Sequence, residues 1–274
     1  MIQSNINLLK IYFGHPYPIT DKIIIHQPTI HDIIEYGEHE FYATLFMFIG
    51  NTTYRKLFLW ENGIDWNKVS DYELFCNLVP VLPVEKTSIL FGDIDFETFE
   101  LYETGYEPPD EPPPDPEHKP TQREKQQKKF ELFEKSFTLR SEELDIEIDA
   151  DTYHRMVGVL CHIAQIFPKT EYTFSKVTKE LMIEEEKNLL KREIAQSNNE
   201  PKSSLLPLIS TCINHPGFKY KSSELEQIGI AEFMDSVKRL QIYESTRALM
   251  NGAYSGMADL SKVPKEQFDF MRSI

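Results

Sequence analysis

The chain has 274 residues, 41% of them hydrophobic, and its 18 Phe and 13 Tyr are enough for a large core, which excludes global disorder. Its 44 acidic and 29 basic residues give a formal net charge of −15, and such a field repels the phosphates of a nucleic-acid partner. The three cysteines, Cys76, Cys161 and Cys212, lie far apart without a C-x-x-C pair, so neither a disulfide framework nor a zinc site is indicated.

The N-terminal residues 1–20 lack the charged and long apolar regions of a signal peptide. No stretch of the sequence approaches the roughly 20 apolar residues that span a bilayer. We therefore expect no nucleic-acid partner, no membrane partner and a cytosolic location. The three cysteines are expected to be small buried side chains in a reducing compartment.

A long amphipathic helix is predicted over residues 30–48. Its start carries a pattern like a capping box at Thr29 and Asp32. Ser70 and Glu73 form a second capping box, which opens a shorter helix. The apolar positions of the long helix recur at helical spacing, and they are Ile30, Ile33, Ile34, Gly37, Phe41, Tyr42 and Leu45.

Two runs in which apolar and acidic residues alternate predict the β-structure. The first run is residues 92–96, with Ile94 and Phe96 on one face, and the second is residues 144–149. Neither run is stable alone, so we expect the two to pair as a small antiparallel sheet that packs on helices.

Between these runs, residues 107–117 contain only proline and acidic residues. Proline removes backbone donors and like charges repel, so this Pro/acidic run is expected to be an exposed, disordered insertion. The charge then reverses, and residues 121–137 predict a basic helix with Phe130, Phe133 and Phe137 on one side.

The remainder of the chain is predicted to return to helix. Residues 153–167 are broadly apolar, and the longest helix is expected over residues 230–250. Pro264 is placed to begin a final short helix, because a first helical position needs no backbone donor.

The sequence thus predicts a mainly α protein of the α+β class, with a small antiparallel sheet and an exposed Pro/acidic insertion. We expect a mostly helical region at 1–83 and a helical region at 151–274. Between them, residues 84–150 are expected to form a small β element that contains the disordered loop and the basic helix at 104–136.

No pattern in the sequence supports catalysis or metal binding. His31, Glu35 and His39 share one helical stripe, but over two turns they diverge by about 12 Å, which favours an exposed polar face. The acidic run at 144–149 fails as a calcium loop, because Ala150 replaces the turn glycine. No phosphate-binding loop, dinucleotide motif or nucleophile elbow occurs. We expect no enzyme activity, no cofactor and no metal.

Two stretches carry a family resemblance. Residues 25–45 read IHQPTIHDIIEYGEHEFYATL, and the C-terminal part reads EFMDSVKRLQIYESTRALMNGAYSG, followed by DLSKVPKEQFDFMRSI. In style they resemble tail assembly chaperones and related tail-module proteins of tailed phages that infect Gram-positive hosts. The predicted sheet and its Pro/acidic insertion depart from the compact helical pattern of that family.

The resemblance implies a non-enzymatic phage assembly protein in the cytoplasm of the bacterial host. Tail assembly chaperones are thought to coat the tape-measure protein, to keep its helical hydrophobic seam in solution and to recruit tail tube subunits, so other phage proteins are the expected partners. Binding of a helix in a groove makes candidate anchors of five residues, for which ordinary core burial is the alternative. They are Phe233, Val237, Leu240, Phe130 and Phe133.

Two further functions stay open at this point. The chain can be a structural or connector component that remains in the virion. It can also be an acidic inhibitor or decoy whose Pro/acidic arm binds a basic host protein, in which case salt should weaken the binding. Self-association into a homo-oligomer is likewise left open.

Overall fold

The structure is a computed structural model that describes residues 6–108, 120–196, 202–256 and 263–272. All but the first two residues of the Pro/acidic run at 107–117 lie outside the described residues. The expectation that this run is a disordered insertion therefore stays a prediction.

The described residues form helices α1 to α12 and strands β1 to β5, so the predicted mainly α, α+β class is confirmed. The elements before residue 100 are α1 (Leu8–Tyr12), β1 (Tyr17–Pro18), β2 (Ile24–Ile25), α2 (Ile30–Tyr36), α3 (Glu38–Ile49), α4 (Lys56–Glu61), η1 (Trp66–Lys68), α5 (Asp71–Leu78), η2 (Val79–Val81), α6 (Val84–Phe91) and η3 (Phe96–Thr98). The later elements are β3 (Glu100–Glu103), α7 (Gln122–Ser136), β4 (Phe137–Ser141), β5 (Ile146–Ile148), α8 (Ala150–Ala164), α9 (Lys176–Gln196), α10 (Leu205–Asn214), α11 (Ser222–Leu225), α12 (Ile230–Tyr254) and η5 (Lys265–Phe268).

The single helix predicted over residues 30–48 is in fact two helices, α2 and α3. They meet at Gly37, whose φ of 101° and ψ of 118° lie outside the helical region and favour glycine. The predicted capping box is confirmed, since the Asp32 amide donates to Thr29 Oγ1 and the Thr29 amide donates to the Asp32 carboxylate. At Ser70 only half of the predicted capping box is present: the Ser70 hydroxyl accepts from the Glu73 amide at 3.0 Å and caps α5.

The predicted small antiparallel sheet is present, with strands in the order β3-β4-β5. β5 lies within the predicted run at residues 144–149, whereas the predicted run at residues 92–96 forms no strand. Residues 92–96 form a turn that leads into η3. Gly92 ends α6 with a φ of 63°, and Asp95 caps η3 by accepting from the Glu97 amide at 3.0 Å. The two alternating runs therefore do not pair with each other. β5 pairs instead with β4, which also pairs with β3.

One cluster of buried side chains draws on all three predicted regions, from Ile11 to Val237. Phe48 of α3 lies within ring contact of Phe91 at 4.6 Å and Phe96 at 5.2 Å. Tyr72 of α5 donates its hydroxyl to the main-chain carbonyl of a β5 residue at 2.8 Å, which ties the sheet to the helices. The boundaries at 83/84 and 150/151 stay predictions, and the buried cluster crosses both.

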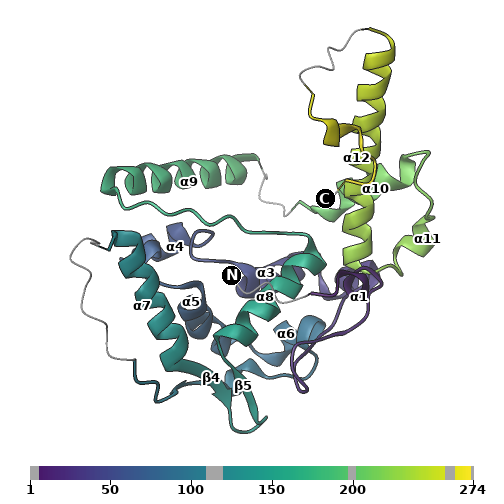
Figure 1. The fold of residues 1–274 in the computed structure, drawn as a ribbon. Helices are drawn as coiled ribbons and strands as arrows, with labels where there is room; N and C mark the ends of the chain where they lie inside the picture. Colours follow the sequence, from purple (N-terminus) through teal and green to yellow (C-terminus); the bar gives the residue numbers. More distant parts are fainter. Residues whose placement is uncertain (1–5, 109–119, 197–201, 257–262, 273–274) are drawn as a thin grey trace.

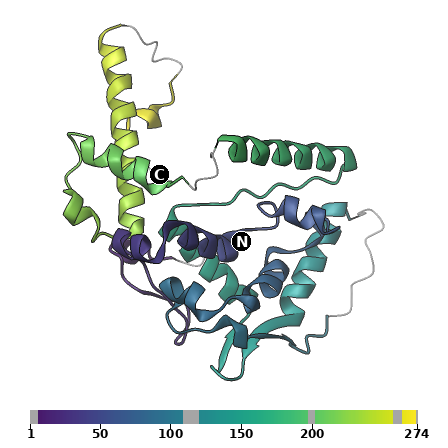
Figure 2. The same ribbon diagram turned by 180° about the vertical axis from the view of Figure 1, so that it is seen from behind.

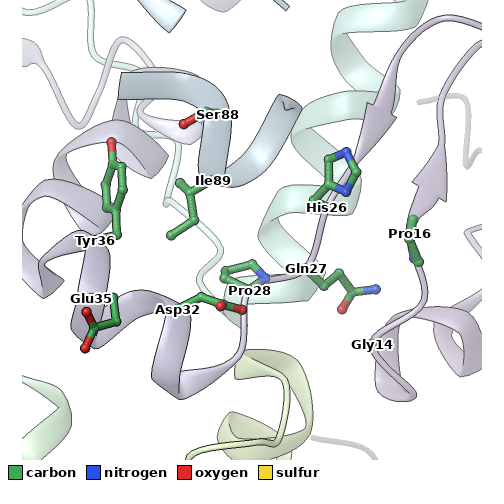
Figure 3. A pocket seen from close by; sticks show the side chains of 10 residues that line it. All are labelled: Gly14, Pro16, His26, Gln27, Pro28, Asp32, Glu35, Tyr36, Ser88 and Ile89. Carbon is green, nitrogen blue, oxygen red and sulfur yellow. The ribbon is translucent and has the colours of Figure 1, made fainter. Parts of the chain in front are cut away.

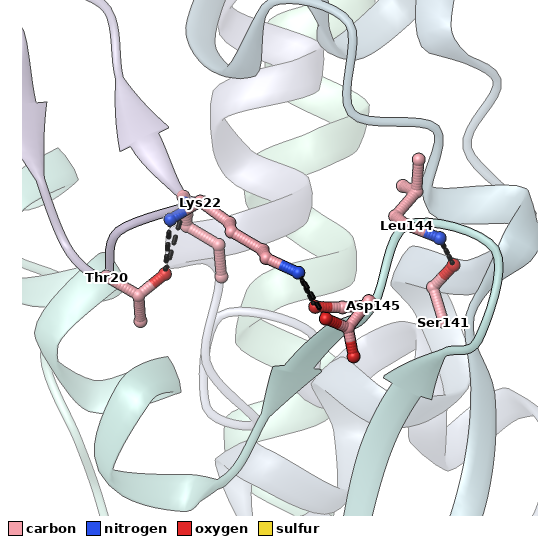
Figure 4. Close-up of polar contacts among 6 residues, drawn as sticks. Thr20, Lys22, Ser141, Leu144 and Asp145 are labelled. Atoms are coloured by element: carbon pink, nitrogen blue, oxygen red, sulfur yellow. Dashed lines mark hydrogen bonds and ion pairs between the residues drawn. The ribbon is translucent and has the colours of Figure 1, made fainter.

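The turn between β4 and β5 is held by a lysine from the N-terminal part of the chain (Figure 4). Asp145 in this turn has a φ of 50°, in the left-handed region. Lys22 Nζ donates to the main-chain carbonyl of Asp145 at 2.6 Å and to its carboxylate at 2.5 Å. The hydrogen bond, followed by the positive charge of Lys22, lowers the pKa of Asp145. Segments far apart in the sequence are thereby joined.

α12 projects from the body as an arm (Figure 1, Figure 2). The segment after Pro264, which forms η5 as predicted, folds back along this arm. Thr246 Oγ1 donates to the Gln267 carbonyl at 3.0 Å, and Arg239 donates to the Arg272 carbonyl at 2.8 Å. The helix expected over 230–250 is confirmed and continues to Tyr254.

Within the part of the chain that the structure describes, no single helix combines the length and the apolar composition needed to cross a membrane. Among the described residues, one pair of segments, Asp71–Val81 and Val84–Phe91, meets that criterion when taken together, and it is bent by 120°.

Glu38, the first residue of α3, also caps the N-terminus of α10. Its Oε1 accepts from the Ser204 amide at 2.7 Å, the Ser204 hydroxyl at 2.6 Å and the Leu205 amide at 2.9 Å. Burial alone raises the pKa of Glu38, but hydrogen bonds from the serine hydroxyls and from these amides outweigh it and leave the pKa below its ordinary value.

Glu38→Gln is expected to lower the free energy of unfolding at pH 7 by about 1 kcal/mol, because a neutral amide is a weaker acceptor at a helix N-terminus. Since the folded pKa is depressed, the carboxylate stabilises the protein above its unfolded pKa of about 4.3 and loses this effect as pH falls through the folded value. Urea titrations should show a smaller difference in the free energy of unfolding between Glu38→Gln and the wild type at pH 3 than at pH 7. Glu40→Gln, on the same helix, should change the free energy of unfolding little at either pH. If Glu38→Gln lowers the free energy of unfolding equally at both pH values, the assignment of the Glu38 carboxylate as the cap of α10 is contradicted.

Candidate functional site

A hollow of about 500 Å³ lies beside α12 at the base of the arm, and we call it the C-terminal hollow. α1, the loop between α10 and α11, α12 and the segment after η5 all contribute to it. Its lining residues are Tyr12, His215, Gly217, Phe218, Lys219, Tyr220, Asp235, Ser236, Arg239, Leu240, Tyr243 and Phe270.

The apolar floor of the C-terminal hollow follows from helix geometry and aromatic packing. Leu240 and Tyr243 lie three residues apart, so α12 presents them on one face. Phe270 packs on the Tyr243 ring at 5.5 Å, and Phe218 meets the Tyr220 ring edge-on at 5.6 Å. The hollow is therefore lined largely by rings that come from separate segments.

Charged side chains also line the hollow beside these rings. Asp235 and Arg239 lie 3.9 Å apart on α12, and His215 lies 3.3 Å from Glu244. Tyr220 donates its hydroxyl to Glu232, and this hydrogen bond, together with burial, raises the pKa of Tyr220 to about 12. An aromatic floor with a charged rim is the composition typical of the centre of a protein–protein interface.

A second hollow of about 410 Å³ lies against α7, and we call it the α7 hollow. The guanidinium of Arg123 lies over the Tyr172 ring at 5.7 Å, and Phe130 faces the same space. Its lining residues are Ser70, Asp71, Arg123, Gln126, Gln127, Phe130, Glu131, Glu134, His154, Tyr172 and Phe174.

The five predicted partner-binding residues occupy different environments. Phe233 and Val237 are buried in the core, with 0% and 7% of their surface exposed. Phe133 is half-buried and packs on Phe137 at 4.7 Å and against the core. Leu240 lines the C-terminal hollow and Phe130 lines the α7 hollow. The partner-binding role of these residues stays a prediction.

A third cavity, of about 610 Å³, lies between α2, α6 and the N-terminal segment (Figure 3). Two of its titratable side chains, Asp32 and Tyr36, have structural partners. Asp32 accepts from the Thr29 amide, and the Tyr36 hydroxyl donates to the Lys86 carbonyl at 2.8 Å. Such groups position the backbone, and we assign no chemistry to this cavity.

The described residues contain no group of three or more His, Cys, Asp or Glu side chains placed to hold a metal ion. The helical stripe expected for Glu35 and His39 is interrupted by Gly37, where α2 ends. Burial raises the pKa of the Cys76 thiol to about 12 and that of Cys161 to about 11, so both are poor nucleophiles at neutral pH.

No model of a known protein family, no curated protein and no solved structure matches the chain. The structure is that of a mainly α protein with aromatic-lined hollows on its surface.

Proposed function

We propose that the chain is a non-enzymatic tail assembly chaperone of a tailed phage. It binds the tape-measure protein and tail tube subunits in the cytoplasm of the bacterial host. The C-terminal hollow is the observation that supports this proposal most strongly, together with the resemblance of both ends of the sequence to that family.

The hollow suits an amphipathic helix as its ligand. Aromatic side chains such as Tyr243 and Phe270 bury large apolar areas at a small cost in side-chain entropy. A helix that carries an apolar stripe inserts side chains into such a floor and keeps its polar face toward the rim. The hydrophobic seam of a tape-measure protein offers many such stripes along one chain.

Two separate hollows add to this binding through effective concentration. When a segment of a long partner binds the C-terminal hollow, a neighbouring segment meets the α7 hollow as an intramolecular event. Each contact can therefore be weak and exchangeable, which suits a chaperone that must later release its client to the tube subunits.

Co-expression with the tape-measure protein of the same phage tests the proposal. The tape-measure protein should aggregate when expressed alone and remain in the supernatant, bound to this chain, when both are made. Tyr243→Ala/Phe270→Ala should weaken the complex at least tenfold, because both rings are removed from the floor of the hollow. Tyr254→Ala is the matched control, since Tyr254 lies on the same helix and is 89% exposed.

The thermal unfolding midpoint of the double variant should equal that of the wild type, because Tyr243 and Phe270 are 48% and 42% exposed. A stable double variant that still holds the tape-measure protein in solution contradicts the assignment of the hollow. A tape-measure protein that aggregates equally with and without the wild-type chain contradicts the proposed function itself.

Mass spectrometry of purified phage particles separates a chaperone from a virion component. The chain should be absent from mature particles, while tube and tape-measure peptides are abundant. Recovery of the chain in fixed proportion to the tape-measure protein would make it a structural or connector component instead.

A further inference from the structure

α9 uses one face to pack on the body. Ile183 is 4% exposed and lies in a buried cluster with Leu59, Trp66 and Leu74. Lys179, one turn earlier, is 8% exposed and lies 2.6 Å from the Asp65 carboxylate. We call this side the inner face of α9.

The opposite side of α9 carries exposed apolar residues. Leu181 lies two residues from both Lys179 and Ile183, which at 100° per residue places it on the far side of the helix. Leu181 is 60% exposed and Val177 is 65% exposed. Viewed along the helix axis at 100° per residue, Asn188 points in a direction between those of Leu181 and Val177. We call the side of the helix that these three residues define the outer face of α9.

Figures 1 and 2 both show α9 at an edge of the molecule, with the α12 arm rising to one side of it. No described element lies over the outer face. A second protein can therefore approach the outer face without displacing the α12 arm.

The charges beside the outer face are arranged symmetrically about Asn188. Glu184 and Glu185 precede it by four and three residues, and Lys191 and Arg192 follow it by three and four. All four side chains are exposed. The acidic half of the outer face thus mirrors its basic half in number and spacing.

The other charged residues of α9 mostly have ion-pair partners. Lys176 pairs with Glu180, and Lys187 pairs with Glu61 at 3.1 Å. Glu186 lies 2.7 Å from Lys56 of α4. Among the described residues, by contrast, Glu184, Glu185, Lys191 and Arg192 form no ion pair of this kind with one another or with the body.

We propose that the outer face of α9 binds the outer face of α9 in a second copy of this chain, antiparallel and about a two-fold axis at Asn188. On the outer face, Glu184 and Lys191 lie to one side of Asn188, and Glu185 and Arg192 lie to the other. The two-fold rotation therefore brings Glu184 opposite Lys191 of the second copy, and Glu185 opposite Arg192 of the second copy. Each pair occurs twice, as an isologous interface requires.

The rest of the outer face is compatible with the same register. Leu181 lies opposite Ala195 of the second copy, and Asn188 meets its own symmetry mate, where two amide side chains can hydrogen-bond and fix the register. A parallel arrangement would instead place like charges opposite each other. Charge complementarity therefore selects the antiparallel pair.

The interface is small, because a single helix pair buries less than the roughly 1,200 Å² at which standard interfaces begin. The dimer should therefore be weak, concentration-dependent and sensitive to salt. This inference goes beyond the proposed function, since it concerns self-association and needs no phage partner.

Sedimentation equilibrium of the full chain, from about 10 to 500 µM, tests the proposal. The weight-average mass should rise from the monomer value of 32.1 kDa toward twice that value, and raised salt should reverse the rise. Glu184→Lys/Glu185→Lys and Lys191→Glu/Arg192→Glu should each weaken dimerisation at least tenfold. All four positions are exposed, so folding should be unaffected.

A mixture of the two double variants gives the sharpest result. The first variant has an all-basic outer face and the second an all-acidic one, so the mixture should form heterodimers at concentrations at which each variant alone is monomeric. Glu142→Lys/Glu143→Lys, on the exposed turn between β4 and β5, carries the same charge change and should dimerise like the wild type. A wild-type chain that stays monomeric, or variants that fail to complement each other, would overturn the proposal.

Discussion

Phe233→Ala is expected to lower the free energy of unfolding by about 3–5 kcal/mol, because a fully buried phenyl ring leaves a cavity that the surrounding helices fill only in part. Phe233 is 0% exposed and lies in the main buried cluster, where α12 meets α8 and α1. Urea unfolding followed by circular dichroism measures the change, and the variant should unfold at a much lower urea concentration than the wild type.

Tyr243→Ala is the matched control on the same helix, since its ring is 48% exposed. It should change the free energy of unfolding by less than about 1 kcal/mol. If Phe233→Ala instead keeps wild-type stability and loses only partner binding, then Phe233 is an anchor and its burial in the core is wrong.

Trp66→Ala is expected to weaken the packing of α9 on the body by a similar free energy, about 3–5 kcal/mol. Trp66 is 1% exposed and packs with Leu59, Leu74 and Ile183 in the second buried cluster. Lys179 Nζ also lies over its ring at 5.7 Å. Without the indole, α9 should open locally, so a protease should cut within α9 at a concentration that leaves the wild type intact.

Phe58→Ala serves as the control for this change, because Phe58 lies on the neighbouring α4 but is 54% exposed. Its cleavage pattern should match that of the wild type. A Trp66→Ala variant with an intact, protease-resistant α9 would show that the second cluster does not hold this helix.

Helices were predictable from the sequence wherever local chemistry marks their ends. Thr29 and Ser70 accept the amide hydrogen bonds that their sequence patterns predict. The break at Gly37 was missed because the apolar spacing continues across it. A glycine with a positive φ changes the direction of the chain without disturbing the sequence pattern.

The strands were harder to predict, because pairing partners lie far apart in the sequence. The alternation at residues 92–96 looked like a strand, yet Asp95 uses its carboxylate to cap a 3₁₀ turn. β4 was not predicted, because Phe130, Phe133 and Phe137 share a helical spacing. The helix pattern therefore includes Phe137, which is the first residue of β4. The strand begins where α7 ends, at Phe137.

The candidate site shows the same limit. Phe233, Val237 and Leu240 lie at i, i+4 and i+7, so the sequence identifies a shared stripe. The sequence does not show where that stripe leaves the core. Phe233 and Val237 are buried in the core, whereas Leu240 lines the C-terminal hollow. Phe218 and Phe270 were not predictable as site residues, because only the folded chain brings them together.

Amide hydrogen exchange on the complex with the tape-measure protein tests whether the C-terminal hollow holds this partner. Exchange should be slower in the segments 215–220 and 236–243, which contain most of the residues that line the C-terminal hollow. The Tyr243→Ala/Phe270→Ala variant should show no slowing in these segments. A complex that forms while exchange in both segments stays at the rate of the free protein would contradict the claim that this hollow holds the partner.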